Sequence, residues 1–220
     1  MRVIFLGPPG SGKGTQAKRV MDRFSIPQLS PGDLLRQAAR EGTPLGKEAE
    51  GYMKAGKLVP DELVDAMILR RIRGVNFQSG FLLDGFPRTV AQAEHLSQAM
   101  EEEGMRLDAV VNLEIDPEVI IHRLMGRRVC PKGHGEWHVE FNPPATEGKC
   151  DTCGEALIQR ADDTEEHIRT RLDAYARLTR PVITYYEKLG LLWRVQADGD
   201  LEKITANIER ALLEAQARAN

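Results

Sequence analysis

The segment Phe5 to Gln16, FLGPPGSGKGTQ, places four glycines around one lysine directly after a short apolar run. Glycines let backbone N–H groups approach phosphate oxygens closely, and a following helix N-terminus adds favourable partial charge. Residues 7–14 fit G-x-x-x-x-G-K, whose amides cradle phosphates while the lysine, here Lys13, reaches the β and γ groups. A glycine-rich turn without a ligand is the alternative, but the expected strand and helix on either side favour nucleotide binding.

The residue after Lys13 departs from the usual pattern. Gly14 stands where a hydroxyl ligand of Mg²⁺ is normally found, and Thr15 follows one place later. We therefore expect magnesium to be held mostly through waters and substrate. Asp84, at the end of an apolar strand, can orient that water shell beside the phosphates.

Arginines are placed where they could neutralise a transferring phosphoryl group. They fall at element ends or in the two inserts described below, at Arg36, Arg88, Arg123, Arg127, Arg160 and Arg171. Each one alone is also typical of a solvated surface. Together they indicate phosphoryl transfer, because several guanidinium groups can clamp two polyphosphates in line.

The three cysteines form the pattern C-x₁₉-C-x₂-C at Cys130, Cys150 and Cys153. This is a poor disulfide framework but a reasonable metal cluster, and His134 or His138 can supply a fourth ligand. Zinc is the default ion, and iron or cobalt accepts the same ligands. Four protein ligands leave no open position, so the metal would be structural. A metal-free segment with three reduced thiols is the alternative.

The elements that position these residues alternate between short strands and long helices, which indicates an α/β fold with a parallel sheet core flanked by helices. Strands are expected at 3–6, 81–83, 109–113 and 191–195, and helices at 14–24, 61–74, 90–103, 117–125, 164–189 and 201–217. Two inserts break the alternation: a helix-rich stretch at 30–59 and a turn-rich stretch at 127–160.

Charge and hydropathy limit the partners that we expect. The 220 residues include 30 basic and 33 acidic ones, for a formal net charge of −3. This balance does not favour nucleic acid, a zinc-finger module or a membrane surface. No apolar run approaches the ~20 residues of a membrane span, and no charged leader precedes the first strand. We expect a cytoplasmic monomer with small-molecule substrates.

The chain resembles the adenylate kinase family, in its bacterial form with a long, metal-binding lid, over essentially its whole length. The segments GPPGSGKGTQ, SPGDLLR, GKLVPDELV, GFLLDGFPRTVAQA, GRRVCP, HVEFNPP, QRADD and RLDAY follow the family's order and spacing. The resemblance implies a core like that of P-loop nucleoside triphosphate hydrolases at 1–29, 60–126 and 165–220, an AMP-binding insert at 30–59 and a lid at 127–164. The implied reaction is ATP + AMP ⇌ 2 ADP, with ATP and Mg²⁺ bound.

The same resemblance implies the site residues. ATP would be held by Gly10, Ser11, Gly12, Lys13, Gly14, Thr15, Arg123, Arg127, Glu136, Trp137 and Gly199. AMP would be held by Pro31, Arg36, Lys57, Leu58, Val59, Gly85, Phe86, Pro87, Arg88, Gln92, Arg160 and Arg171. Catalysis would fall to Lys13, Asp84, Arg88, Arg123, Arg127, Arg160 and Arg171.

Two positions depart from the family's pattern. The family usually has threonine at the place of Pro31, so a hydroxyl expected near AMP is missing and more of the base recognition falls to Gln92. Family members with a metal lid usually have a second cysteine at the place of Gly133. His134 follows it directly, whereas His138 belongs to a segment that metal-free lids also contain, so we favour His134 as the fourth ligand and keep His138 as the alternative.

Two other functions fit parts of the sequence. A UMP or CMP kinase could use the same scaffold, but the long metal lid argues against it. A P-loop regulatory switch of the GTPase kind would need a guanine-reading motif such as N-K-x-D, which the sequence does not contain.

Overall fold

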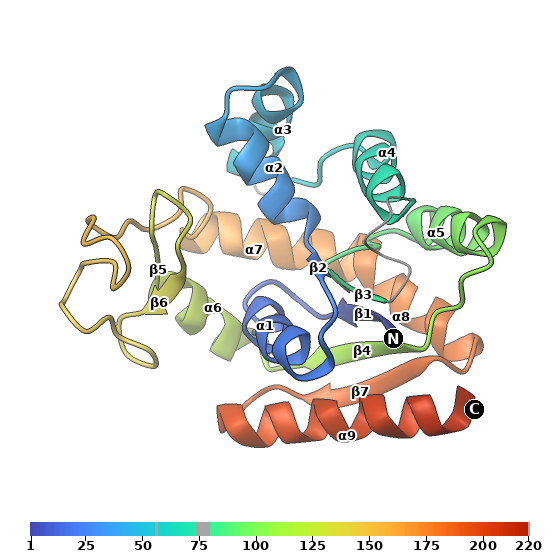
Figure 1. Ribbon diagram of the computed structural model, residues 1–220. Coiled ribbons are helices and arrows are strands. Elements are labelled where there is room, and N and C mark those ends of the chain that lie inside the picture. The colour runs from blue at the N-terminus through green and yellow to red at the C-terminus, as the bar shows by residue number, and fades with distance from the viewer. Residues whose placement is uncertain (56, 74–79, 220) are drawn as a thin grey trace.

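Helices pack on both faces of a five-stranded parallel sheet (Figure 1). The structure, a computed structural model, describes residues 1–55, 57–73 and 80–219. The strand order is β2-β3-β1-β4-β7, from β1 (Arg2–Leu6), β2 (Gln28–Leu29), β3 (Phe81–Asp84), β4 (Ala109–Glu114) and β7 (Leu192–Gln196). The predicted α/β class and parallel sheet are confirmed. Strand β2 was missed because two residues give no readable alternation.

Alternate residues of β1 are buried in two separate cores. Ile4 and Leu6 pack with side chains of α4 (Asp61–Ile72), α5 (Val90–Glu102) and α8 (Arg180–Lys188). Val3 and Phe5 pack on the opposite face with side chains of α1 (Lys13–Phe24) and α9 (Leu201–Ala219). Because both faces are covered, the sheet forms a buried platform for the loops that leave its strands.

The helix-rich stretch at 30–59 consists of α2 (Pro31–Arg40) and α3 (Pro44–Lys54), as predicted. Proline opens both helices, where its missing N–H costs nothing, and the preceding Ser30 and Thr43 cap them by accepting a backbone N–H. Pro117 opens α6 (Pro117–Met125) in the same way, behind the cap Asp116.

The helix predicted at 164–189 is wrong as a single element. Thr164 caps α7 (Glu165–Ala174), the chain then widens into the π-helix η2 (Tyr175–Thr179), and α8 follows. Pro181 has no N–H to donate to the preceding turn, which explains why the regular α-helical pattern cannot run through this point. The other predicted ends differ by one or two residues, except that Gly74 lies outside the described residues.

The turn-rich stretch at 127–160 forms the yellow and orange loops on the left of Figure 1. Its regular structure is a short antiparallel pair, β5 (Arg127–Val129) with β6 (Glu136–His138), which the sequence did not predict. Val139 and Phe141 stay 55% and 60% exposed, so this region buries little apolar surface. In the described ranges of the chain, no helix has the length and apolarity needed to cross a membrane.

Candidate functional site

The glycine-rich loop between β1 and α1 needs its glycines for space and for backbone conformation. Gly7, Gly10 and Gly12 adopt φ values of 145°, 79° and 88°. A Cβ atom at Gly7 would lie 2.8 Å from the carbonyl oxygen of Leu113, and one at Gly10 would lie 2.9 Å from Cγ of Leu124. Larger residues are therefore excluded, and the chain turns directly into the N-terminus of α1.

Lys13 lies over the centre of this loop. Its Nζ atom donates hydrogen bonds to the carbonyl oxygens of Gly7 and Pro8, each at 2.8 Å. Desolvation lowers the pKa of Lys13 to about 8, although the nearby Asp84 carboxylate raises it. A phosphate in the loop would favour the charged form of the lysine, because its negative charge offsets the lost hydration.

Asp84 ends β3 beside the first turn of α1. A Cβ atom at Gly14 would lie 3.6 Å from Oδ2 of Asp84, and the same oxygen accepts a 2.8 Å hydrogen bond from Nε2 of Gln28. Burial raises the pKa of Asp84, and the Lys13 ammonium lowers it. Gln28, on the short strand β2, is a positioning residue that the sequence did not reveal.

Arg88 and Gln92 are fixed to each other and to the turn after β3. The backbone N–H of Arg88 donates to Oε1 of Gln92 at 2.7 Å, and Nε of Arg88 donates to the carbonyl oxygen of Gly85 at 2.8 Å. Desolvation, with the charges of Arg171 and Arg36, lowers the pKa of Arg88 to about 10. The oxygen of the Gln92 amide is thus engaged within the protein.

Asp163 orients two of the predicted arginines and was missed by sequence reasoning. It is fully buried and accepts Nε and Nη2 of Arg127 at 2.8 and 2.6 Å. Nη1 of Arg171 reaches the same carboxylate at 3.2 Å. The segment QRADD contains two adjacent aspartates, and nothing in the sequence says which of them is buried.

Positive charge accumulates around the loop. Lys13, Arg88, Arg160 and Arg171 each have a pKa lowered first by desolvation and also by at least one neighbouring guanidinium group. Desolvation and the charges of Arg127 and Arg36 lower the pKa of Arg160 to about 10. This lowering persists although Arg160 also forms an ion pair with Glu136. Crowded cations of this kind suit a ligand with several negative charges, such as a polyphosphate.

The predicted metal ligands Cys130, His134, Cys150 and Cys153 come together in the turn-rich region. Their ligand atoms all lie within 4.8 Å of one another. Sγ of Cys130 lies 3.7 Å from Sγ of Cys153 and 3.5 Å from Nδ1 of His134. Two thiolates on one tetrahedral zinc ion would lie about 3.8 Å apart, since each Zn–S bond is about 2.3 Å. The donor set therefore fits a tetrahedral ion.

Hydrogen bonds from the turns around the cluster favour the thiolate form. Burial raises the pKa of Cys130, but the backbone N–H groups of His134 and Lys132 act in the opposite direction, and the pKa falls to about 6. A second tight turn, closed by the 2.8 Å hydrogen bond from the N–H of Gly154 to the carbonyl oxygen of Cys150, brings Cys150 and Cys153 together.

His138 is engaged outside this cluster. Its Nδ1 atom accepts the backbone N–H groups of Glu140 and Phe141, both at 3.0 Å, and its ring stacks on Phe141 with 4.4 Å between centroids. The ring also fills the space that a side chain at Gly126 would need. The geometry thus favours His134 over His138 as the nitrogen ligand.

Comparison with known proteins gives the family. A model of the family described as adenylate kinase matches residues 5–191. The chain belongs to the adenylate kinase family. An adenylate kinase of Moorella thermoacetica is 48% identical over 96% of this chain and 98% of the relative, and one of Thermodesulfovibrio yellowstonii is 49% identical over 94% and 97%. An adenylate kinase of Clostridioides difficile is 46% identical over 96% and 98%.

Several residues expected from the adenylate kinase pattern lie on the inserts. Pro31 is the first residue of α2, and Arg36 is bound to Asp33 on the same helix at 2.5 Å. Lys57, Leu58 and Val59 follow α3, with Val59 in the core. Trp137 donates its indole N–H to Asp151 at 2.8 Å, so this contact lies within the turn-rich stretch 127–160.

The remaining expected residues surround the loop. Ser11 is buried within it, and Thr15 is exposed on the first turn of α1. Phe86, after Gly85, is fully buried, and Pro87 follows it before Arg88. Arg123 lies on α6, and Asp198 raises its pKa against the larger lowering by desolvation. Gly199 follows Asp198 directly, so it lies on the side of the site where α6 ends.

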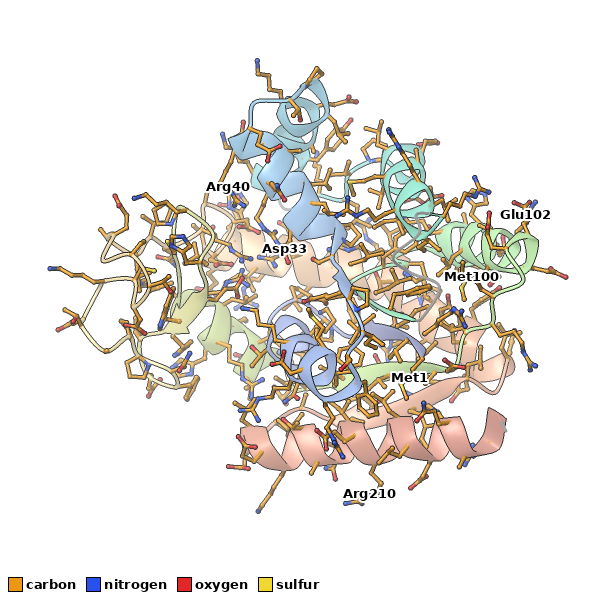
Figure 2. All side chains as sticks on the ribbon, in the orientation of Figure 1. Met1, Asp33, Arg40, Met100, Glu102 and Arg210 are labelled. Atoms are coloured by element: carbon orange, nitrogen blue, oxygen red, sulfur yellow. The ribbon has the colours of Figure 1, made fainter. Side chains whose placement is uncertain are left out.

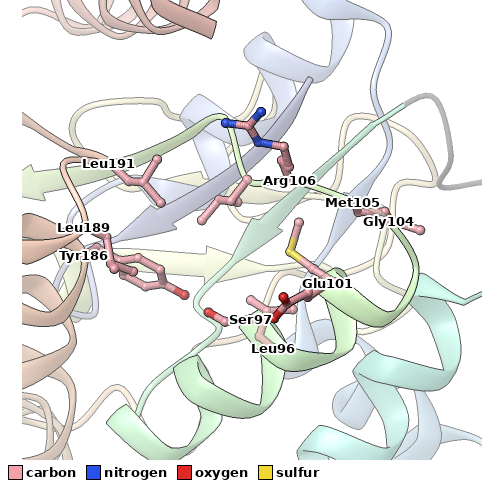
Figure 3. A pocket seen from close by; sticks show the side chains of 11 residues that line it. Leu96, Ser97, Glu101, Gly104, Met105, Arg106, Tyr186, Leu189 and Leu191 are labelled. Carbon is pink, nitrogen blue, oxygen red and sulfur yellow. The ribbon is translucent and has the colours of Figure 1, made fainter.

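A cavity of about 560 Å³ lies elsewhere, between α5, α8 and the segment before β4 (Figure 3). Its lining includes Leu96, Met100, Tyr186 and Leu191. None of the residues expected to bind nucleotide lines it, so we assign it no part in the reaction.

Proposed function

We propose that this chain catalyses ATP + AMP ⇌ 2 ADP and so balances the adenine nucleotides. The cluster of desolvated cations around the glycine-rich loop is the observation that supports this most strongly, because it matches the charge of two facing polyphosphates. Membership of the adenylate kinase family supports the same reaction. The proposed organisation is a core at 1–29, 60–126 and 165–220, an AMP-binding insert at 30–59 and a lid at 127–164.

The phosphate loop holds ATP in this proposal. Backbone N–H groups of residues 10–15 face the phosphates, and Lys13 leaves the carbonyl oxygens of Gly7 and Pro8 to follow the transferring group. Mg²⁺, when bound, would neutralise part of the negative charge of the phosphates. Asp84, held by Gln28, orients the water around that ion, which suits a chain whose Gly14 offers no hydroxyl.

The AMP side is formed by α2, the end of the insert and the turn after β3. Arg36, Arg88 and Arg171 face the AMP phosphate, with Arg160 between AMP and ATP. Gln92 recognises the base through its amide nitrogen, since its oxygen is engaged by Arg88. Pro31 offers neither a hydroxyl nor an N–H, and the carbonyl oxygens of residues 57–59 and 85–87 provide further contacts.

The lid closes over ATP. Arg123 and Arg127 contact its phosphates, while Trp137, Glu136 and the backbone at Gly199 lie toward its adenosine. Asp163 holds Arg127 and Arg171 in position for both nucleotides. Closure excludes water that would otherwise hydrolyse ATP.

An acceptor comparison tests the reaction. ADP formation is measured in a coupled assay with ATP and one of AMP, UMP, CMP or GMP at equal concentrations. We expect AMP to give the highest kcat/KM. A higher kcat/KM with UMP or CMP would show that the chain is another nucleoside monophosphate kinase. ATP turnover with no preference among the acceptors would contradict the proposed kinase reaction.

We further propose that Cys130, His134, Cys150 and Cys153 hold a structural zinc ion, which iron or cobalt can replace. Elemental analysis of two variants tests the ligand set. His134→Ala should lose most of its metal, whereas His138→Ala should retain about one ion per chain. Loss of metal from His138→Ala alone would show that the ligand choice is wrong.

Reduced thiols are needed for this cluster, which favours a cytoplasmic protein. We propose that it acts as a monomer, since one chain supplies every residue of the proposed site. Size-exclusion chromatography with light scattering should give a mass near 24.6 kDa, and a stable dimer would contradict it.

A further inference from the structure

The AMP insert and the lid come close together between Arg40 and Gly133. Arg40 is the last residue of α2 and is labelled in Figure 2, on the side of that helix that faces the lid. A Cβ atom at Gly133 would lie 3.2 Å from Nη2 of Arg40 and 3.6 Å from its Cζ. In the part of the chain that the structure describes, this guanidinium group makes no hydrogen bond or ion pair. Its charge is therefore directed at the lid turn without a partner inside its own insert.

Gly133 lies between two of the proposed metal ligands, in the turn from Cys130 to His134. The turn is closed by a 2.9 Å hydrogen bond from the N–H of Gly133 to the carbonyl oxygen of Cys130. Three thiolates and a neutral imidazole around a divalent ion leave a net charge of about −1. Lys132, in the same turn, is already paired with Glu155 at 2.7 Å. Arg40 therefore brings an unpaired positive charge to a turn that is negative when metal is bound.

The contact also needs glycine at position 133. Gly133 has a φ of 83°, a backbone conformation that residues with a side chain adopt only with strain. A Cβ atom at this position would also lie in tight contact with the guanidinium group of Arg40. The absence of a side chain at Gly133 leaves room for the Arg40 guanidinium group beside the turn.

We propose that Arg40 is a positioning residue that links the two inserts, by docking on the Cys130–His134 turn of the metal-loaded lid. Docking stabilises the arrangement in which the AMP insert and the lid meet over the nucleotides, so AMP binding becomes tighter when the lid is closed on ATP. The inference rests on the proposed function, because it assigns the insert to AMP and the lid to ATP.

The test is a calorimetric measurement of AMP affinity in the presence of a saturating, nonhydrolysable ATP analogue. The wild-type chain is compared with Arg40→Glu, Arg40→Lys and the control Lys47→Glu, which makes the same charge change on an exposed residue of α3. Each protein is measured with zinc bound, at low and at high salt, and again after chelation with its metal content determined.

Arg40→Glu should weaken AMP binding about fivefold, since exposed ion pairs contribute up to about 1 kcal/mol, which is about fivefold in affinity. The loss should shrink in high salt and after metal removal. Arg40→Lys should keep most of the affinity, and Lys47→Glu should be near wild type.

Equal losses in Arg40→Glu and Lys47→Glu would overturn the proposal, and so would a loss that is unchanged by metal removal. Failure of the wild-type chain to bind AMP at all would instead contradict the proposed function. The two failures are therefore distinguishable.

Discussion

The phosphate loop and the lid obtain their order in different ways. The loop leaves a strand whose Val3, Ile4 and Phe5 are fully buried, so the sheet and its helices fix where it turns. The lid leaves Phe141 and Ile158 60% and 48% exposed, and depends on a cysteine and histidine cluster, a short strand pair and the ion pairs of Asp163. We therefore expect that the lid can loosen without disturbing the loop. Substitutions in the loop should therefore lower kcat, whereas metal removal from the lid should lower the thermal midpoint.

The largest effect is expected at Lys13. Lys13→Ala should lower kcat by about 10³-fold or more, because the transferring phosphoryl group loses the cation that follows it. The fold should remain, since within the described part of the chain the ammonium group of Lys13 is hydrogen-bonded to loop carbonyl oxygens and Ser11. The assay is ADP formation, and the control is an unchanged thermal midpoint without nucleotide. Near-normal turnover would contradict the role given to the loop.

Arg88→Ala and Arg127→Ala should each lower kcat by about 10²-fold. Each removes a guanidinium group that would stabilise charge on the transferring phosphoryl group, one from the core side and one from the lid. Steady-state kinetics with both substrates varied separate kcat from KM. An effect confined to KM would mean that these arginines bind ground and transition states equally well.

Asp163 connects the lid with the core, because its carboxylate binds one arginine from each of them. Asp163→Asn keeps the size of the side chain but removes the charge that orients Arg127 and Arg171, and should lower kcat by about tenfold. Asp162→Asn is the matched control, since among the described residues the side chain of Asp162 forms an ion pair with Arg171 and none with Arg127. Similar kinetic losses in both variants would contradict the orienting role of Asp163.

Residue types and periodicity were enough to predict the core. Buried runs such as Val3 to Leu6 and long helical patterns gave the order of strands and helices, and the glycine pattern gave the loop. Strand β2 was missed because Gln28 and Leu29 are ordered by pairing with β3 and not by a pattern of their own. The break at η2 was missed because the side-chain periodicity of the 164–189 segment continues across it.

Site residues could be predicted where they form a contiguous sequence motif. They could not be predicted where residues distant in the sequence contact each other in the folded chain. Gln28 and Asp84 are far apart in the chain, and Asp163 meets Arg127 across the base of the lid. The cysteine spacing predicted a cluster and the sequence pattern favoured His134 over His138, but the hydrogen bonds that engage His138 elsewhere could not be read from the sequence. The contact between Arg40 and Gly133 has no sequence signal at all.

The most direct test of the account is turnover and thermal unfolding of the same protein before and after metal removal. Chelation should lower the midpoint of the lid transition by about 5 °C or more, because metal binding free energy contributes to folding of the site. Well below that midpoint, with ATP and AMP saturating, kcat should stay within about threefold of the metal-loaded value, since the groups assigned to the chemistry lie outside the cluster. If kcat instead falls in proportion to the metal lost while the lid is still folded, or if protein prepared without chelators contains no metal, the division between a catalytic loop and a metal-stabilised lid is wrong.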